Sequence, residues 1–244
     1  MGARIVALAL SDSVFLVTGA MEATGHPTIG QDVGLLVGTK AIGVRVVDDP
    51  STALKAGSVL IEFTRPEATL EHVRIAQQRK IPVVIGTTGL SDAQREAVVA
   101  ASKDIPIVLS PNMSVGVNLL FELVQIAARR LGLAYDIEVV EAHHRAKQDA
   151  PSGTAKKLIE VLAASRSQPS TKIPVHSMRA GDIVGDHTVI FAGPSERLEL
   201  THRAQSRDAF AVGALRAAHF LSSQRKAGLY EMSDVLQASL SPKP

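Results

Sequence analysis

The 244-residue chain contains no cysteine and no tryptophan, and its aromatic residues amount to only 3% of the sequence. Without thiols there can be no disulfide, no thiolate metal site and no cysteine nucleophile. Few aromatic rings are present on which nucleic-acid bases could stack, and a formal net charge of +2 is small for a polyanion-binding surface. We therefore expect no nucleic-acid partner.

A long hydrophobic run is also missing, since no stretch of about 18 apolar residues occurs. Hydrophobic residues make up 45% of the chain and charged residues 20%, which is typical of a soluble globular protein. The length allows one large domain or two small ones. We expect a cytoplasmic protein without a membrane partner, and the spacing of its histidines and carboxylates predicts no metal site.

Residues 136–157 combine an apolar strand, a group of cations and the start of a helix. Ile137, Val139 and Val140 are β-branched, as in a buried strand, and residues 155–162 have the pattern of a short helix. Four potential cations occupy five positions between the two elements, namely His143, His144, Arg145 and Lys147. A basic loop of this kind is also typical of a solvated surface.

The turn before the helix has the residues of an anion site. Pro151 fixes one φ angle, Gly153 allows close backbone approach, and Ser152 or Thr154 can cap the first helical turn. The backbone N–H groups around Gly153 and Thr154 would then point outward at a helix N-terminus, where anions bind. Together with the cations, this turn predicts a pocket for a small substrate with several negative charges.

The first part of the chain alternates apolar strands with helices. We expect strands at 15–21, 44–47, 58–63, 81–85 and 105–109, and helices at 4–10, after Ser51, at 66–78, from a capping box at 91–94, and at 117–131. Residues 23–39 are expected to form a mobile loop. This alternation predicts a Rossmann-like parallel sheet covered on both faces. Ligands of such sheets bind at the carboxyl ends of the strands, here segments 64–67, 86–89 and 110–113.

Two features at these strand ends have more than one reading. Glu22 follows the second expected strand, where a dinucleotide-binding fold holds the ribose hydroxyls, but it can equally be a surface carboxylate. The segment Gly86-Thr-Thr-Gly89 can bind a ligand or simply turn the chain from strand to helix.

The last third of the chain has a different pattern. Residues 165–171 are polar and predict a loop, whereas 175–179, 187–192 and 197–203 alternate like antiparallel strands with one solvated face. A final helix is expected from Arg207 to about residue 226, with Phe210 in the core. The sequence therefore predicts a second, α+β domain with a mostly antiparallel open sheet.

The segment Glu141-Ala-His-His-Arg-Ala-Lys-Gln-Asp-Ala-Pro-Ser-Gly-Thr-Ala155 resembles the signature of the 4-hydroxy-tetrahydrodipicolinate reductase family, formerly called dihydrodipicolinate reductase. Segments 62–67, 86–89, 112–118 and 179–187 are also similar to the family, the last to a hairpin, and the resemblance extends from Met1 to about Leu236. It implies reduction of 4-hydroxy-tetrahydrodipicolinate to tetrahydrodipicolinate by NADH or NADPH in the diaminopimelate route to lysine. It further implies a homotetramer formed through the second domain's sheet.

The resemblance assigns roles to particular residues. His143 would be the acid or base and Lys147 the proton donor, while His144, Gly153 and Thr154 would bind the substrate. The cofactor would contact Met1, Glu22, Gly86, Thr87, Thr88, Ser110, Pro111, Asn112, Met113 and Arg207. The implied domains are a dinucleotide-binding domain of residues 1–114 and 207–244, and a substrate-binding and oligomerisation domain of residues 115–206.

Two departures from the family pattern concern the cofactor. The family opens with a strand and a Gly-x-Gly-Gly-Arg-Met-Gly loop that binds pyrophosphate, whereas this sequence matches only the tail of that loop, from Met1 to Arg4. We expect Met1 to be an internal methionine of a longer natural chain. Some members also place arginine after the ribose-binding acid, where it meets the 2′-phosphate of NADPH. Here that residue is Ala23, which favours NADH.

Two other functions remain compatible with these residues. Without the pyrophosphate loop, the chain could be a dicarboxylate-binding protein that has lost cofactor binding and catalysis. It could also be a different two-domain dehydrogenase acting on amino or hydroxy acids, although the combination of His143, His144, Lys147 and the Ser152–Thr154 turn argues against that alternative.

Overall fold

The computed structural model describes residues 1–224 and 226–238, which form two compact units. The first unit contains Met1–Met113 together with the chain from Phe210 onward, and the second contains Ser114–Ala209. Each unit has its own cluster of buried apolar residues. Among the described residues, no helix combines the length and the apolar character needed to cross a bilayer.

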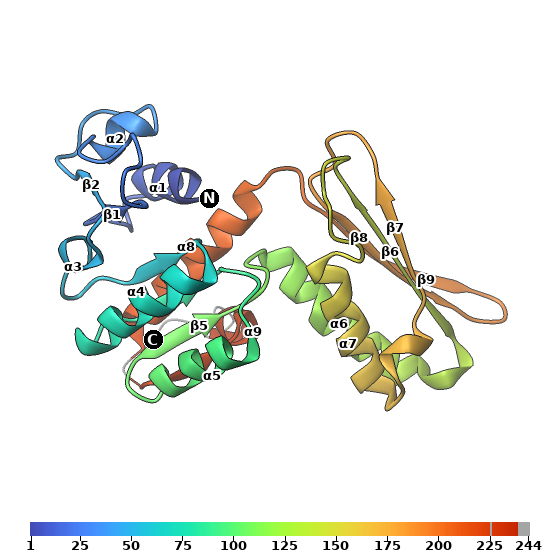
Figure 1. The fold of residues 1–244 in the computed structure, drawn as a ribbon. Helices are drawn as coiled ribbons and strands as arrows, with labels where there is room; N and C mark the ends of the chain where they lie inside the picture. Colours follow the sequence, from blue (N-terminus) through green and yellow to red (C-terminus); the bar gives the residue numbers. More distant parts are fainter. Residues whose placement is uncertain (225, 239–244) are drawn as a thin grey trace. The chain divides into compact units, whose positions relative to one another are not determined.

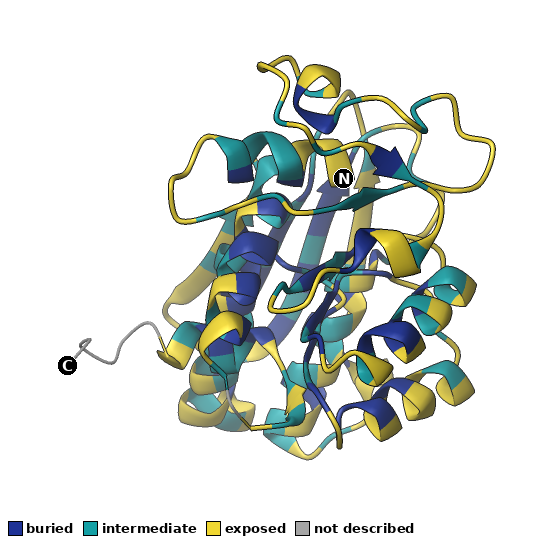
Figure 2. Ribbon diagram, turned by 90° about the vertical axis from the view of Figure 1, so that its left-hand side faces the viewer, coloured by how far each residue is buried: buried dark blue, intermediate teal, exposed yellow. Residues whose placement is uncertain are grey.

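The first unit is built on a parallel sheet, as the sequence predicts. Its strands are β3 (Leu60–Glu62), β4 (Val83–Ile85), β5 (Pro106–Leu109) and β10 (Gly228–Tyr230), in the order β10-β5-β4-β3. The helices α4 (Pro66–Gln78) and α5 (Asp92–Ala101) lie side by side on one face, and α8 (Asp208–Ser223) lies on the other (Figure 1). Figure 2 shows the buried residues concentrated on the strands and on the inner sides of the helices.

Local sequence signals explain where these helices begin. Pro66 occupies the first position of α4, where its missing N–H has no intrahelical partner to lose. Ser91 and Gln94 form the expected capping box at the start of α5, each side chain accepting a backbone N–H of the other residue. Between these helices, β3, β4 and β5 are almost wholly apolar and their core side chains are buried, as in a sheet covered on both faces.

The strands expected at 15–21 and 44–47 are mostly wrong. They are reduced to β1 (Ala20–Met21) and β2 (Val46–Val47), which pair in parallel as a two-stranded sheet separate from the four-stranded one. Val14 and Leu16 are 62% and 84% exposed, so the apolar residues before β1 have no neighbouring strand on which to pack. Helix α1 (Gly2–Leu10) precedes them, close to the predicted range.

Two expectations about the segment after β1 also need correction. Residues 23–39 contain the short helix α2 (Val33–Leu36), because the Asp32 carboxylate caps it and also accepts the N–H groups of Ile42 and Gly43. These hydrogen bonds lower the pKa of Asp32 although burial opposes them. Helix α3 (Pro50–Ala53) is capped by Asp49 and not by Ser51, which lies inside the helix.

The second unit pairs two helices with one mixed sheet. Its strands are β6 (Asp136–His143), β7 (Val175–Arg179), β8 (Asp186–Ala192) and β9 (Arg197–Arg203), in the order β7-β6-β8-β9. The helices α6 (Val115–Leu131) and α7 (Gly153–Arg166) cover one face of this sheet (Figure 1). The largest buried side chains of the shared core include Phe191, Leu158 and Leu162. Two 3-10 turns, Gly132–Ala134 and Ser170–Lys172, connect the elements.

Strand β7 is where the expected antiparallel pattern fails. It pairs with β6 in parallel, whereas β6 with β8 and β8 with β9 are antiparallel, as expected. Because β6 lies between β7 and β8, residues 179–187 cross the end of β6 and do not form the hairpin that the resemblance implies. Alternation along a strand reports which face is buried, and it does not report the direction of the partner strand.

The ends of the last elements also differ from expectation. Helix α7 continues to Arg166, so the predicted loop at 165–171 is shorter and holds the turn Ser170–Lys172. Helix α8 ends at Ser223 instead of about residue 226. Strand β10 and helix α9 (Met232–Ala238) are additional elements that the sequence pattern does not predict.

Candidate active site

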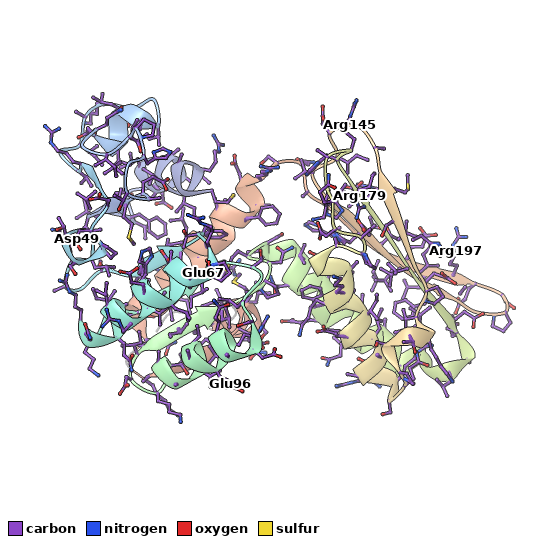
Figure 3. The ribbon with its side chains drawn as sticks, viewed as in Figure 1. Asp49, Glu67, Glu96, Arg145, Arg179 and Arg197 are labelled. Carbon is purple, nitrogen blue, oxygen red and sulfur yellow. The ribbon has the colours of Figure 1, made fainter. Side chains whose placement is uncertain are left out.

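The candidate site of the second unit is built around the fully buried side chain of Glu141, near the end of the central strand β6. The guanidinium of Arg179 donates to both oxygens of this carboxylate, with Nη1–Oε2 at 2.9 Å and Nη2–Oε1 at 2.7 Å. Figure 3 shows Arg179 at the same end of the sheet as Arg145, with Arg197 farther along. The bidentate pairing of Arg179 with Glu141 suits the planar geometry of the guanidinium group.

Two further groups donate to the Glu141 carboxylate. His143 lies two residues along the strand, so its side chain is on the same face, and its Nδ1 is hydrogen-bonded to Oε2. The backbone N–H of Ser152 donates to Oε1 at 3.2 Å. Burial alone would raise the pKa of Glu141, but hydrogen bonds from Arg179, Ser177, His143 and Ser152 lower it to about 2. The carboxylate is therefore ionised near neutral pH.

The imidazole of His143 has one nitrogen held by Glu141 and one nitrogen without a hydrogen bond. Its pKa lies below the usual value, because burial and the positive charges of Lys147 and Arg179 outweigh the attraction of Glu141. Since an ionised carboxylate only accepts, Nδ1 carries the proton that it donates. No described residue is hydrogen-bonded to Nε2, and a Cβ at Gly185 would lie 3.1 Å from it.

A second buried histidine, His187 on β8, packs beside this pair. Its ring meets that of His143 edge to face, with centroids 5.1 Å apart. Its Nε2 lies 3.1 Å from the hydroxyl of Ser152, which also caps α7 by accepting the N–H of Ala155 at 3.1 Å. Burial, followed by repulsion from His143, lowers the pKa of His187 to about 3, so this ring stays neutral over the physiological range.

Lys147 lies in the loop that follows β6 and is also tied to the Glu141 pair. Its Nζ is 2.8 Å from Oδ1 of Asp149, and its backbone N–H donates to the carbonyl of His144 at 3.1 Å. The carbonyl of Asp149 in turn accepts from Nη2 of Arg179 at 2.6 Å. Arg179 therefore contacts both the carboxylate that holds His143 and the residue paired with Lys147.

The predicted substrate-binding residues lie at the start of α7 and beside it. Gly153 is the first residue of α7, it is exposed, and nothing lies within 4 Å of the position that a Cβ would take. The first turn of α7 contains no acidic residue, which suits an anion at its N-terminus. Thr154 follows in the same turn. A shallow pocket near the loop is lined by His144, Arg145, Ala146, Asp182, Val184 and Arg207.

That pocket also locates Arg207, which the resemblance assigns to the cofactor. Within the second unit it shares the pocket lining with His144 and Arg145. Arg207 thus adds a second arginine to the lining around His144, which also contains the carboxylate of Asp182.

The remaining cofactor candidates lie in the first unit, mostly after the aligned ends of β3, β4 and β5. Thr87 is buried, and its hydroxyl accepts the N–H of Thr64 at 3.2 Å and bonds the Thr69 hydroxyl at 2.8 Å. The Thr87 side chain thus holds two strand ends together, whereas Thr88 is exposed. A side chain at Gly86 would collide with the ring of Phe63, 2.4 Å from the Cβ position.

The segment after β5 is a compact turn. The hydroxyl of Ser110 donates to the carbonyl of Asn112 at 2.7 Å, while Pro111 is exposed and Met113 is buried. Gly213 of α8 packs against the carbonyl of Met113 so closely that a Cβ would lie 1.7 Å from its oxygen. The backbone of this segment is therefore fixed by its neighbours.

Met1 and Glu22 belong to the separate part of the first unit with β1 and β2. Met1 is the residue before α1, and its carbonyl accepts the N–H groups of Arg4 and Ile5. Helix α1 has no side-chain cap and no acidic residue in its first turn. Glu22 follows β1, is exposed, and its Oε1 accepts the N–H of Ala23 at 2.8 Å.

Sequence reasoning did not identify Glu141, Arg179 or His187 as members of the site. Glu141 opens the recognised signature, and its spacing of two from His143 on a strand could have indicated a shared face. Arg179 and His187 are the first and last residues of segment 179–187, for which the sequence suggested only a hairpin. Their partners are 35 to 38 residues away in the chain, so no local pattern connects them.

Taken together, the parallel sheet with polar turns after its strands and the cationic pocket in a second α+β unit define the class of protein. They are the features of a two-domain oxidoreductase of the Rossmann type, in which one domain takes the dinucleotide and the other the substrate.

Comparison with known proteins identifies the family. Models described as "Dihydrodipicolinate reductase, N-terminus" and "Dihydrodipicolinate reductase, C-terminus" match residues 1–113 and 116–236. A 4-hydroxy-tetrahydrodipicolinate reductase of Anaeromyxobacter sp. (strain Fw109-5) is 47% identical over 97% of this chain and 93% of its own length. The enzyme of the same name from Nitrosospira multiformis is 48% identical over 90% and 87% of the two chains. The chain belongs to the dihydrodipicolinate reductase family, whose members are NAD(P)H-dependent oxidoreductases.

A solved structure supports the same fold. The dipicolinate-bound dihydrodipicolinate reductase of Paenisporosarcina sp. TG-14 matches with a TM-score of 0.76 over 94% of this chain and 92% of its own, at 22% sequence identity. The predicted family and the predicted fold class are thus confirmed. The comparisons support a reductase over a binding protein without catalysis.

Proposed function

We propose that this chain reduces 4-hydroxy-tetrahydrodipicolinate to tetrahydrodipicolinate with a nicotinamide dinucleotide, in the diaminopimelate route to lysine. The observation that supports this most directly is that the Glu141 carboxylate binds His143 and the N-terminus of α7, while Arg179 joins it to the loop that carries Lys147. Relatives named for this reaction share 47–48% of their residues with the chain over nearly its whole length.

The two carboxylates of the substrate would be bound by positive groups of the second unit. Gly153 and Thr154 lie in the first turn of α7, which contains no acidic residue, and His144 lines the pocket by the loop after β6. We assign Arg207 to the same pocket because it lines it together with His144. Anionic substrates suit this pocket, because its two arginines, Arg145 and Arg207, outnumber its one carboxylate, Asp182.

Lys147 and His143 would supply the proton that completes the reduction. The bound cofactor provides the hydride, and its addition leaves electron density on the substrate that must be protonated. Lys147 has a flexible side chain, and its ion-pair partner among the described residues is Asp149, an exposed carboxylate. We assign it as the proton donor and His143 as the acid or base that relays protons through Nε2.

The first unit would bind the cofactor, and its residues fit such a group. The backbone of Gly86, Thr88 and the segment from Ser110 to Met113 would hold the nicotinamide half at the ends of β4 and β5, with Thr87 as the internal brace. The uncapped start of α1 beside Met1 would receive a phosphate. In this proposal the first unit, Met1–Met113 with the chain from Phe210 onward, is the dinucleotide-binding domain, and Ser114–Ala209 is the substrate domain.

Among the two nicotinamide cofactors we propose that NADH is preferred. Glu22 is exposed at the end of β1 and is followed by Ala23, so its carboxylate can accept ribose hydroxyls and would repel a 2′-phosphate. A homotetramer formed through the sheet of the second unit, and a cytoplasmic location, complete the proposal.

An assay that follows NADH oxidation with freshly generated substrate tests this function. We expect turnover with 4-hydroxy-tetrahydrodipicolinate, and at least tenfold lower kcat/KM for amino-acid or hydroxy-acid substrates and for NADPH in place of NADH. A chain that binds a substrate analogue by calorimetry but oxidises neither cofactor would contradict the proposal. Higher kcat/KM with NADPH would contradict only the cofactor preference.

A further inference from the structure

The Glu141–Arg179 pair is the most deeply buried ionic group of the second unit, and the proposed roles of the site residues leave it unused. Glu141 has no exposed surface, and the Arg179 side chain is 18% exposed. Removing a carboxylate and a guanidinium from water is costly, and their mutual attraction offsets that cost only with good geometry and further hydrogen bonds. The other hydrogen bonds of Glu141 and Arg179 therefore bear on the role of this pair.

The contacts of Glu141 show that it determines the tautomer of His143. Its oxygens take both Nη atoms of Arg179, Nδ1 of His143 and the backbone N–H of Ser152. With its carboxylate ionised, Glu141 can only accept, so the proton of neutral His143 stays on Nδ1. The lone pair is then on Nε2, the nitrogen without a hydrogen bond among the described residues.

The contacts of Arg179 extend to the loop that carries Lys147. Beyond its two bonds to Glu141, Nη1 donates to the carbonyl of Met178 at 2.6 Å and Nη2 to the carbonyl of Asp149 at 2.6 Å. Asp149 is the ion-pair partner of Lys147. One planar guanidinium thus joins the carboxylate behind His143 to the backbone beside Lys147. A lysine at this position would keep the positive charge but lacks the planar set of paired donors that makes these hydrogen bonds.

We propose that Glu141 and Arg179 are positioning residues of this site: Glu141 holds His143 with its proton on Nδ1, and Arg179 fixes both Glu141 and the loop that carries Lys147. This inference rests on the proposed function for the roles of His143 and Lys147. Glu141 is buried behind His143, so it acts through that histidine and not on the substrate.

The charges around His143 determine how its titration responds to substitutions. It faces Glu141 on its own strand, Arg179 on β7, His187 on β8 and Lys147 in the following loop. Glu141 is the only negative charge in this group and favours the protonated ring. Replacing it with a neutral residue leaves two cations opposite His143, so the titration of the ring moves to lower pH.

The test compares Glu141→Gln and Arg179→Lys with two matched controls. Glu138→Gln changes a carboxylate on the same strand that is paired at the surface with His176, and Arg197→Lys changes an exposed arginine paired with Glu199. We expect kcat of both site variants to fall about tenfold or more with less than threefold change in KM, and both controls to stay within twofold. The His143 limb of the pH profile should move to lower pH in Glu141→Gln.

Nitrogen NMR of the His143 ring gives a readout independent of turnover. The wild-type ring should be the Nδ1-protonated tautomer, and Glu141→Gln, which removes the ionised acceptor, should show a mixture of tautomers. Circular dichroism checks folding, and Arg179→Lys, which keeps the charge, decides the outcome if Glu141→Gln does not fold. An Nδ1-protonated ring in both variants with unchanged kcat would overturn the inference. A wild-type chain without turnover but with that tautomer would reject the proposed function and leave the positioning of His143 intact.

Discussion

At the scale of single residues, the space beside Nε2 of His143 depends on Gly185 having no side chain. A Cβ at that position would lie 3.1 Å from Nε2 and 3.4 Å from Cδ2 of the imidazole, closer than ordinary van der Waals contact. The backbone of Gly185 is not in the left-handed region, so alanine there introduces crowding without backbone strain. This residue therefore offers a way to displace the ring without changing any charge.

We predict that Gly185→Ala lowers kcat about tenfold through a shift of the His143 ring, with a small effect on stability. The measurement is steady-state kinetics beside thermal unfolding. Gly228→Ala is the control for an added methyl group, since a Cβ at that position in β10 would meet only Tyr230, at 3.5 Å or more, and Gly228 has no role in the proposed site. If Gly185→Ala keeps full turnover, Nε2 of His143 is not the reacting nitrogen.

Lys147 and His144 should separate kinetically. We predict that Lys147→Ala reduces kcat by about 10²-fold or more with a smaller change in KM, because it removes a proton donor needed only in the transition state. His144→Ala should mainly raise KM, since it removes a partner of a substrate carboxylate. Steady-state kinetics at saturating cofactor measures both. If both variants raise KM equally and leave kcat unchanged, both residues act in substrate binding alone.

The sequence predicts site roles for His143, Lys147 and the Ser152–Thr154 turn because they lie within 12 residues and a signature connects them. Glu141 belongs to the same stretch, yet its importance depends on Arg179, 38 residues later. A buried carboxylate looks the same in the sequence as an exposed one. Only the strand pairing reveals that this one is fully buried and is held by hydrogen bonds from Arg179, His143 and Ser152.

At the scale of elements, the start of α7 is a junction between helix and site. The Ser152 hydroxyl caps the helix through the N–H of Ala155 and also bonds Nε2 of His187, whereas Ser91 caps α5 through Gln94 at an exposed position. The two serines have the same helical role in different surroundings. They therefore form a natural pair for comparison.

We predict that Ser152→Ala lowers the free energy of unfolding by about 2 kcal/mol and Ser91→Ala by about 1 kcal/mol. The additional loss at Ser152 comes from His187, whose Nε2 would be left buried without its partner. Urea denaturation of both variants measures the difference. Equal losses would show that the contact between Ser152 and His187 contributes no stability.

Helices with strong local signals were predictable, and short or non-local strands were not. Pro66 and the Ser91–Gln94 capping box are recognisable in the sequence, and the helices begin where these signals place them. The direction of β7 depends on the position of β6 in space, and β1 and β2 pair over only two residues each. Apolar patterns report burial but not pairing, so these strands could not be assigned from the sequence.

At the scale of the whole molecule, the buried histidine makes stability depend on pH. His187 has a pKa of about 3 in the folded chain and about 6.5 when unfolded. Below pH 6.5 the unfolded chain therefore binds a proton that the folded chain refuses. Stability is complete above 6.5 and is lost as the pH falls towards 3, by about 1.4 kcal/mol per pH unit. Glu141, with its pKa lowered to about 2, adds a further loss below about 4.5.

We predict that the free energy of unfolding drops by roughly 2–3 kcal/mol between pH 7 and pH 4.5 through His187, and that His187→Gln removes most of this drop. Urea titrations at a series of pH values measure it. His176→Gln is the control, since that histidine lies at the surface. An identical slope in His187→Gln would mean that the ring is protonated in the folded chain.

The parallel addition of β7 beside β6 also has a consequence for synthesis on the ribosome. Glu141 and the loop after β6 leave the exit tunnel 38 residues ahead of Arg179. At translation rates of about 5–20 residues per second, Arg179 is synthesised roughly 2–8 seconds after Glu141, so the carboxylate has no guanidinium partner during that time. The residues that we propose as catalytic are thus made early, but their hydrogen bonds to Arg179 form only after the edge strand β7 has been made. A nascent chain that ends before Val175 therefore carries the signature without the Glu141–Arg179 pair.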